Sequence, residues 1–183
     1  MNWLLIIALL AGPRVHPGPA PTIPVLTDDE LRDKIHAYLG SIDTPIPEDR
    51  WRALGPRAAA VLEPVVTDAN AMPSRRAKAI DGLVAAAPDR AARLVGKLAR
   101  DDAQPTVVRV AALHGAAKVL SSSRLITEVK PVMQRAPEAG LRGEAAEVLS
   151  RAKGGCEAVR AHAAREKGDD REAYRRALAR CGE

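Results

Sequence analysis

The fold is decided by three segments that repeat one pattern: RAKAIDGLVAAA (residues 76–87), RVAALHGAAKVL (109–120) and RGEAAEVLSRAK (142–153). Each segment begins with an arginine that is followed three residues later by an alanine, and the arginines Arg76, Arg109 and Arg142 are 33 residues apart. A fixed period of this size is typical of stacked helical repeats. We therefore expect a chain that works by presenting a surface rather than by running a reaction.

Each repeating segment is preceded by a second amphipathic stretch, so the helices are expected in antiparallel pairs. The first helices are predicted over 56–67, 88–101 and 123–135, and the second helices over 73–87, 105–120 and 138–152. Pro73, Pro105 and Pro137 stand at the predicted starts of the second helices, where proline loses no helical hydrogen bond. Apolar residues recur at i, i+3 and i+4 in the second helices, as a one-sided helix requires.

Composition supports an all-α fold. Aromatic residues make up 2% of the chain and phenylalanine is absent, so leucine, valine, isoleucine and alanine must build the core. Alanine has the highest helix propensity, whereas sheets favour β-branched and aromatic residues.

An additional helix is expected before the pairs. Thr27 and Glu30 have the spacing of a capping box, which predicts a helix that starts at residue 28. Gly40 is placed to end that helix. Residues 41–50 contain a turn that leads to Pro47, a good first residue for the next helix, and Trp51 begins the next apolar face.

The block from 51 to 152 resembles the HEAT-repeat family in its short bacterial form. The resemblance rests on the paired helices, on the Arg-x-x-Ala pattern that opens each second helix, and on turn aspartates at Asp68 and Asp101. It implies a short right-handed α-solenoid of antiparallel helix pairs over 27–152. It also implies a structural ladder between neighbouring units, made here by Asp68 with Arg76 and Asp101 with Arg109, and continued by Arg142. The third unit departs from the pattern, because Gln134 stands where an aspartate is expected.

In that family the second helices line a concave face that binds partners. The resemblance therefore implies a set of candidate contact residues on that face: Arg75, Lys78, Arg109, His114 and Lys118. The partner would be a protein or peptide with an acidic surface. The arginine row has two readings, a basic stripe that faces a ligand or a set of ties between units. Strict periodicity favours the ties, because packing between repeats demands regular spacing.

Residues 153–183 are predicted to close the solenoid as a helical hairpin. Its two arms, of about ten and eleven residues, are nearly equal in length at about 1.5 Å per residue, so Cys181 should return beside Cys156. A disulfide would close this loop and contribute about 3 kcal/mol; the alternative is two small buried thiols. Part of the hairpin, with Ala173, Tyr174, Ala177 and Leu178, is similar to a tetratricopeptide hairpin.

The N-terminal segment carries an apolar run, WLLIIALLA (3–11), which is shorter than the roughly 20 residues that span a bilayer. Residues 1–20 are interpreted as a signal peptide or apolar leader, and residues 21–26 as a proline-rich linker. An uncleaved membrane-proximal anchor and a buried helix are the alternatives. The expected location is therefore the periplasm or the exterior, with the cytoplasm as the alternative.

No catalytic, cofactor or metal motif is found in the sequence. The expected function is a non-enzymatic interaction scaffold of the bacterial cell envelope. Nucleic-acid binding is an alternative, since the pI is about 9.6, but base stacking needs aromatic side chains that this chain largely lacks. A third alternative is an accessory subunit of an enzyme.

Overall fold

The computed structural model describes residues 26–42, 44–167 and 169–182, and every regular element among them is a helix. The predicted leader (1–20) and all of the predicted linker except Leu26 lie outside the described residues. Helix α1 (Asp28–Gly40) begins with the expected capping box: the Thr27 hydroxyl accepts from the Glu30 amide at 3.3 Å, and the Glu30 carboxylate accepts from the Thr27 amide at 2.8 Å. No described helix is both long and apolar enough to cross a membrane.

The first predicted helix of the repeats, 56–67, consists of a 3₁₀ turn η1 (Pro56–Ala58) and α3 (Ala59–Thr67), and the short helix α2 (Glu48–Arg52) precedes it. The break between α2 and η1 follows from Gly55, whose positive φ of 69° is a conformation that favours glycine. Trp51 on α2 is buried and meets the ring of Tyr38 edge-on, with centroids 5.1 Å apart. A side chain at Gly82 would come within 2.8 Å of the Trp51 ring, so glycine lets α4 approach α2 closely.

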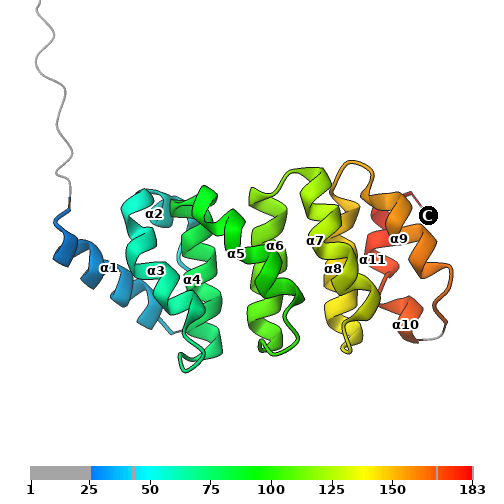
Figure 1. Ribbon diagram of the computed structural model, residues 1–183, viewed down its shortest axis with the longest axis horizontal. Coiled ribbons are helices and arrows are strands. Elements are labelled where there is room, and N and C mark those ends of the chain that lie inside the picture. The colour runs from blue at the N-terminus through cyan, green and yellow to red at the C-terminus, as the bar shows by residue number, and fades with distance from the viewer. Residues whose placement is uncertain (1–25, 43, 168, 183) are drawn as a thin grey trace, which may run out of the picture.

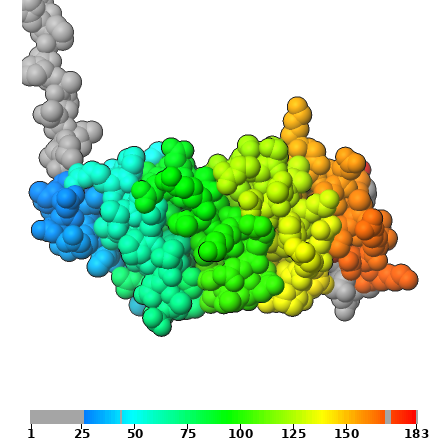
Figure 2. Space-filling model, in the orientation of Figure 1, coloured from blue at the N-terminus to red at the C-terminus, as the bar shows by residue number. Residues whose placement is uncertain are grey.

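The remaining repeats form two layers of helices. The second helices α4 (Pro73–Ala86), α6 (Thr106–Val119) and α8 (Ala139–Ser150) pack side by side, and α5 (Pro88–Arg100) and α7 (Ser122–Arg135) pack beside each other. Each helix also packs against the next one in the chain, which gives the antiparallel pairs expected from the sequence. The units follow one another along the long axis (Figure 1), and each occupies its own band of the surface (Figure 2).

Alanine occupies the closest contacts of the core. The alanines of the Arg-x-x-Ala pattern, Ala79, Ala112 and Ala145, are each fully buried. Their small side chains let the second helices approach one another, and leucine, valine and isoleucine fill the space between the layers. The periodic alanine is therefore a packing residue in all three units.

The periodic arginines are also part of the framework. Arg76 and Arg109 are buried, with 3% and 2% of their surface exposed. The Nε atom of Arg76 donates to the Val66 carbonyl and that of Arg109 to the Ala99 carbonyl, each at 3.1 Å and each ten residues earlier in the chain. Each arginine thus ties its second helix to the end of the first helix in the same pair, where carbonyls lack helical partners.

The contacts between units differ from the predicted aspartate–arginine pairs. Arg76 donates to the Gln104 side chain of the next unit, and Gln104 in turn donates to Asp101 at 2.8 Å. Arg109 pairs with Asp102 at 2.7 Å and lies 3.9 Å from Glu138 of the following unit.

The two turn aspartates bind their own turns instead. Asp68 accepts from the Asn70 amide at 2.9 Å and Asp101 from the Ala103 amide at 3.1 Å. This two-residue bond is the ordinary local preference of aspartate in turns. The prediction that Asp68 and Asp101 pair directly with Arg76 and Arg109 was therefore wrong about the partners.

The third unit is atypical, as its sequence indicated. Arg142 is half-buried, and its Nη1 atom donates to the carbonyls of Ala136 and Pro137 at 2.9 and 3.0 Å. These carbonyls belong to the turn before α8 rather than to the helix end ten residues back. Arg142 therefore secures its own turn in a manner different from the first two arginines.

The C-terminal segment folds back as expected, but its second arm is broken. It consists of α9 (Gly155–Ala163), α10 (Asp169–Glu172) and α11 (Arg175–Arg180). The break lies at Tyr174, whose fully buried hydroxyl donates to the Met133 carbonyl at 3.1 Å. Cys156 and Cys181 form a disulfide with their Cα atoms 5.6 Å apart, which confirms the predicted pairing.

Candidate functional site

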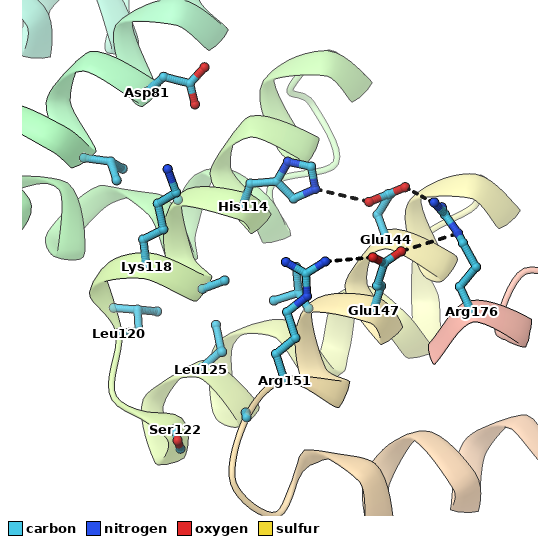
Figure 3. A pocket seen from close by; sticks show the side chains of 15 residues that line it. Asp81, His114, Lys118, Leu120, Ser122, Leu125, Glu144, Glu147, Arg151 and Arg176 are labelled. Atoms are coloured by element: carbon cyan, nitrogen blue, oxygen red, sulfur yellow. Dashed lines mark hydrogen bonds and ion pairs between the residues drawn. The ribbon is translucent and has the colours of Figure 1, made fainter. Parts of the chain in front are cut away.

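A hollow of about 670 Å³ opens on the layer of second helices (Figure 3). Val84, Leu120, Leu125 and Val148 give it apolar patches. Its polar lining comes from α4, α6, the start of α7, α8 and the segments that follow α8: Asp81, His114, Lys118, Ser122, Glu144, Glu147, Arg151 and Arg176. The hollow therefore spans three successive units and also touches the C-terminal hairpin.

Three of these residues occupy one register of the repeat. Asp81, His114 and Glu147 are 33 residues apart, and each stands five residues after a periodic arginine. Equivalent positions of stacked units face the same side, so this spacing brings the three side chains to one surface. The residue type changes from unit to unit here, whereas the arginine and alanine positions keep theirs.

A chain of ion pairs covers the α8 wall of the hollow. Glu144 accepts from His114 at 3.1 Å and from Arg176 at 2.9 Å. Arg176 also lies 3.4 Å from Glu147, which pairs with Arg151 at 2.8 Å. Burial raises the pKa of Glu144, but the hydrogen bonds from His114 and Arg176 and their charges outweigh burial and hold that pKa below its usual value.

The α6 wall carries a cation that is neutralised from a distant part of the chain. Lys118 Nζ lies 2.7 Å from the carboxylate of Glu48 on α2, although the two residues are 70 positions apart. The hydrogen bond and charge of Lys118 lower the pKa of Glu48. Lys118 is therefore engaged within the chain by a carboxylate that also pairs with Arg52 on α2.

Asp81 differs from the other charged residues of the hollow. Within the described part of the chain, no cationic side chain lies within ion-pair distance of its carboxylate. Asp81 is exposed by area, yet it sits in a concave wall where neighbouring protein displaces water, and this loss of hydration raises its pKa. The charges of Lys118 and His114 oppose that rise without cancelling it.

The five predicted contact residues are dispersed by the structure. His114 and Lys118 line the hollow. Lys78 is half-buried and donates to the carbonyl and hydroxyl of Ser41. Arg75 is half-buried in the first turn of α4. Arg109 is buried in the framework, so the prediction that it contacts a partner is wrong.

Six polar residues of the hollow were missed: Asp81, Ser122, Glu144, Glu147, Arg151 and Arg176. Two of them could have been found, because Asp81 and Glu147 share the register of His114. Arg176 carries no such signal, since it belongs to the hairpin. His162, outside the hollow, is half-buried and meets the Tyr174 ring edge-on, with the ring centroids 5.5 Å apart.

The chemistry that the hollow supports is recognition by charged and polar contacts. Its carboxylates and cations come from several elements, and those other than Asp81 are held by ion pairs. No group of three or more histidine, cysteine or carboxylate side chains in the described segments has the arrangement of a metal site. Searches against protein-family models, curated proteins and solved structures found no match for this chain.

Proposed function

We propose that this chain is a non-enzymatic interaction scaffold that seats a peptide segment of a partner protein in the hollow of the second-helix layer. The layered helix pairs and the 33-residue register support a HEAT-like right-handed α-solenoid, a fold that offers its inner helices to partners. A hollow of about 670 Å³ is in the size range of sites that hold small ligands or a few side chains.

One observation carries this proposal: the periodic positions divide into a constant, buried row and a variable row that faces the hollow. Arg76 and Arg109 are used in packing, whereas Asp81, His114 and Glu147 differ between units and lie in one hollow. Packing needs the same residue in each unit, but recognition of a partner needs different ones.

The cell envelope is the proposed location. The disulfide between Cys156 and Cys181 supports it, because structural disulfides persist in oxidising compartments and are rare in the cytosol of most organisms. The apolar run 3–11 supports the same location from sequence.

Nucleic-acid binding has weaker support. Among the described residues, Trp51 and Tyr174 are buried and Tyr38 is half-buried, so none of these rings is fully available for base stacking. An accessory role beside an enzyme would use the same hollow and is a special case of the proposed scaffold.

Site-specific photo-crosslinking tests the proposal. A benzophenone amino acid is placed at His114 in the hollow and, as a matched control, at the exposed Lys97 on α5. After irradiation in the native cell, we expect position 114 to give a discrete protein adduct that position 97 does not. No adduct at 114, or identical adducts at both positions, would refute a partner seated in the hollow.

A further inference from the structure

We propose that the partner segment carries an arginine or lysine whose cationic group binds Asp81. This inference rests on the proposed scaffold function and names the chemistry of its ligand. It reverses the expectation from sequence, which placed mostly basic candidate contact residues on this face and an acidic surface on the partner.

The reversal follows from how the charges of the hollow are paired. Lys118 is held by Glu48 at 2.7 Å, and Arg151 by Glu147 at 2.8 Å. Arg176 is shared between Glu144 and Glu147 at 2.9 and 3.4 Å. The cations that line the hollow are therefore already engaged with carboxylates.

Asp81 is the carboxylate of the hollow that takes part in none of these ion pairs. It projects toward the hollow from α4, opposite the α8 wall (Figure 3). An ionised carboxylate that has lost part of its hydration and has gained no cation gains most from a charged hydrogen-bond donor. A ligand cation at Asp81 would restore the missing partner, whereas a ligand carboxylate would be repelled there.

Arg176 shows how a cationic side chain fits this hollow. It extends from α11, its side chain is 69% exposed, and its guanidinium contacts carboxylates on two positions of α8. A guanidinium on a flexible side chain thus reaches the wall from outside the second-helix layer. A partner arginine would approach Asp81 on the facing wall in the same way, without displacing Arg176.

The direct test is peptide binding measured by fluorescence anisotropy with the full, oxidised chain. One fluorescein-labelled pool consists of alanine- and serine-based heptapeptides with two arginines, and a matched pool carries two glutamates. We expect the arginine pool to bind at least about tenfold more tightly, which corresponds to about 1.4 kcal/mol. Free arginine serves as a third probe, and competition by it at the same concentration would indicate an amino-acid site rather than a peptide site.

Substitutions locate the binding. Asp81→Asn should weaken the binding of the arginine pool about tenfold, a loss in the range of charge-assisted hydrogen bonds. Asp89→Asn is the matched control, because Asp89 is an exposed carboxylate on α5, outside the hollow. Arg176→Ala should strengthen binding, since it removes one of the cations that pair with Glu144 and Glu147 and leaves room there for a second cation of the peptide.

The outcomes distinguish a failure of the cationic-ligand inference from a failure of the proposed scaffold function. Equal affinity of Asp81→Asn and the unmodified chain, or tighter binding of the glutamate pool, would overturn the cationic ligand. Absence of arginine-pool binding while position 114 still crosslinks a partner would overturn it as well, and the scaffold would stand. Absence of both peptide binding and crosslinks would remove the scaffold function itself.

Discussion

Two rows of residues share one 33-residue period, but one row packs in the framework and the other lines the hollow. The row of Arg76, Arg109 and Arg142 keeps its residue type, and its first two members are buried and tied to backbone carbonyls. The row five residues later changes from aspartate to histidine to glutamate and lies in the hollow. In this chain, constancy across units accompanies packing and variation accompanies an open surface.

The same comparison extends along the first row. Arg76 and Arg109 each reach a carbonyl ten residues back and a side chain of the next unit, and Arg142 donates to the carbonyls of the turn before α8. The third unit is followed by a disulfide-bonded hairpin instead of another repeat. The end of the stack therefore has a covalent link in addition to the contacts of its arginine.

The largest effect is expected at the buried arginine. Arg109→Ala should lower the free energy of unfolding by about 3 kcal/mol, because it removes a buried charge together with its packing and leaves the Ala99 carbonyl without its donor. Urea denaturation followed by circular dichroism measures the loss. Arg93→Ala on the exposed face of α5 is the control and should change stability by less than about 0.5 kcal/mol.

The disulfide should rank next. Replacing Cys156 and Cys181 by serine should cost about 3 kcal/mol by the loop-closure relation for a separation of 25 residues. Hydrogen exchange should accelerate in α9 and α11 while α4 and α6 keep their protection. Equal acceleration in α4 would show that the two ends of the stack are not held independently.

Much of the helical framework was predictable from local chemistry. The second helices were predicted over 73–87 and 105–120 and are found at Pro73–Ala86 and Thr106–Val119. Proline at the start and the apolar spacing fix these bounds within the segment itself. The return of Cys181 beside Cys156 likewise followed from the similar lengths of the two arms, although the break of the second arm into α10 and α11 was not predicted.

The side-chain pairs between units were not predictable. Gln104 rather than an aspartate receives Arg76, because Asp68 and Asp101 are already engaged by amides of their own turns. The pair of Lys118 with Glu48 depends on how α2 packs against the stack, which no local pattern encodes. The sequence assigned Arg109 both to the structural ladder and to the partner-contact residues. Its burial in the structure favours the structural role.

A smaller effect is expected for the arginine of the third unit. Arg142→Ala should cost about 1 to 2 kcal/mol, because the half-buried side chain loses two hydrogen bonds to backbone carbonyls. Urea denaturation of this variant beside Arg109→Ala checks the ranking. Equal losses would mean that all three units use their arginines alike.

The smallest effect concerns the pH dependence of the hollow. Since the pKa of Glu144 lies below its usual value in the folded chain, its ionised form stabilises the fold above the unfolded pKa of about 4.3, and this contribution is lost as the pH falls through the folded pKa. Glu144→Gln should therefore lower stability by less than about 1 kcal/mol at pH 7. The difference from the unmodified chain should vanish once the pH is below the folded pKa, and a difference that persists in acid would contradict an electrostatic origin.

The most direct measurement compares Arg76→Ala with Asp81→Asn, one residue from each row on the same helix, for stability and for affinity toward the arginine peptides. We expect Arg76→Ala to lose about 3 kcal/mol of unfolding free energy and, while folded, to keep its affinity. Because the pKa of Asp81 is raised, its ionised form costs stability above that pKa, so Asp81→Asn should unfold within about 0.5 kcal/mol of the unmodified chain or be more stable, yet bind about tenfold more weakly. A large loss of stability in Asp81→Asn with unchanged affinity would contradict the division between framework and binding rows.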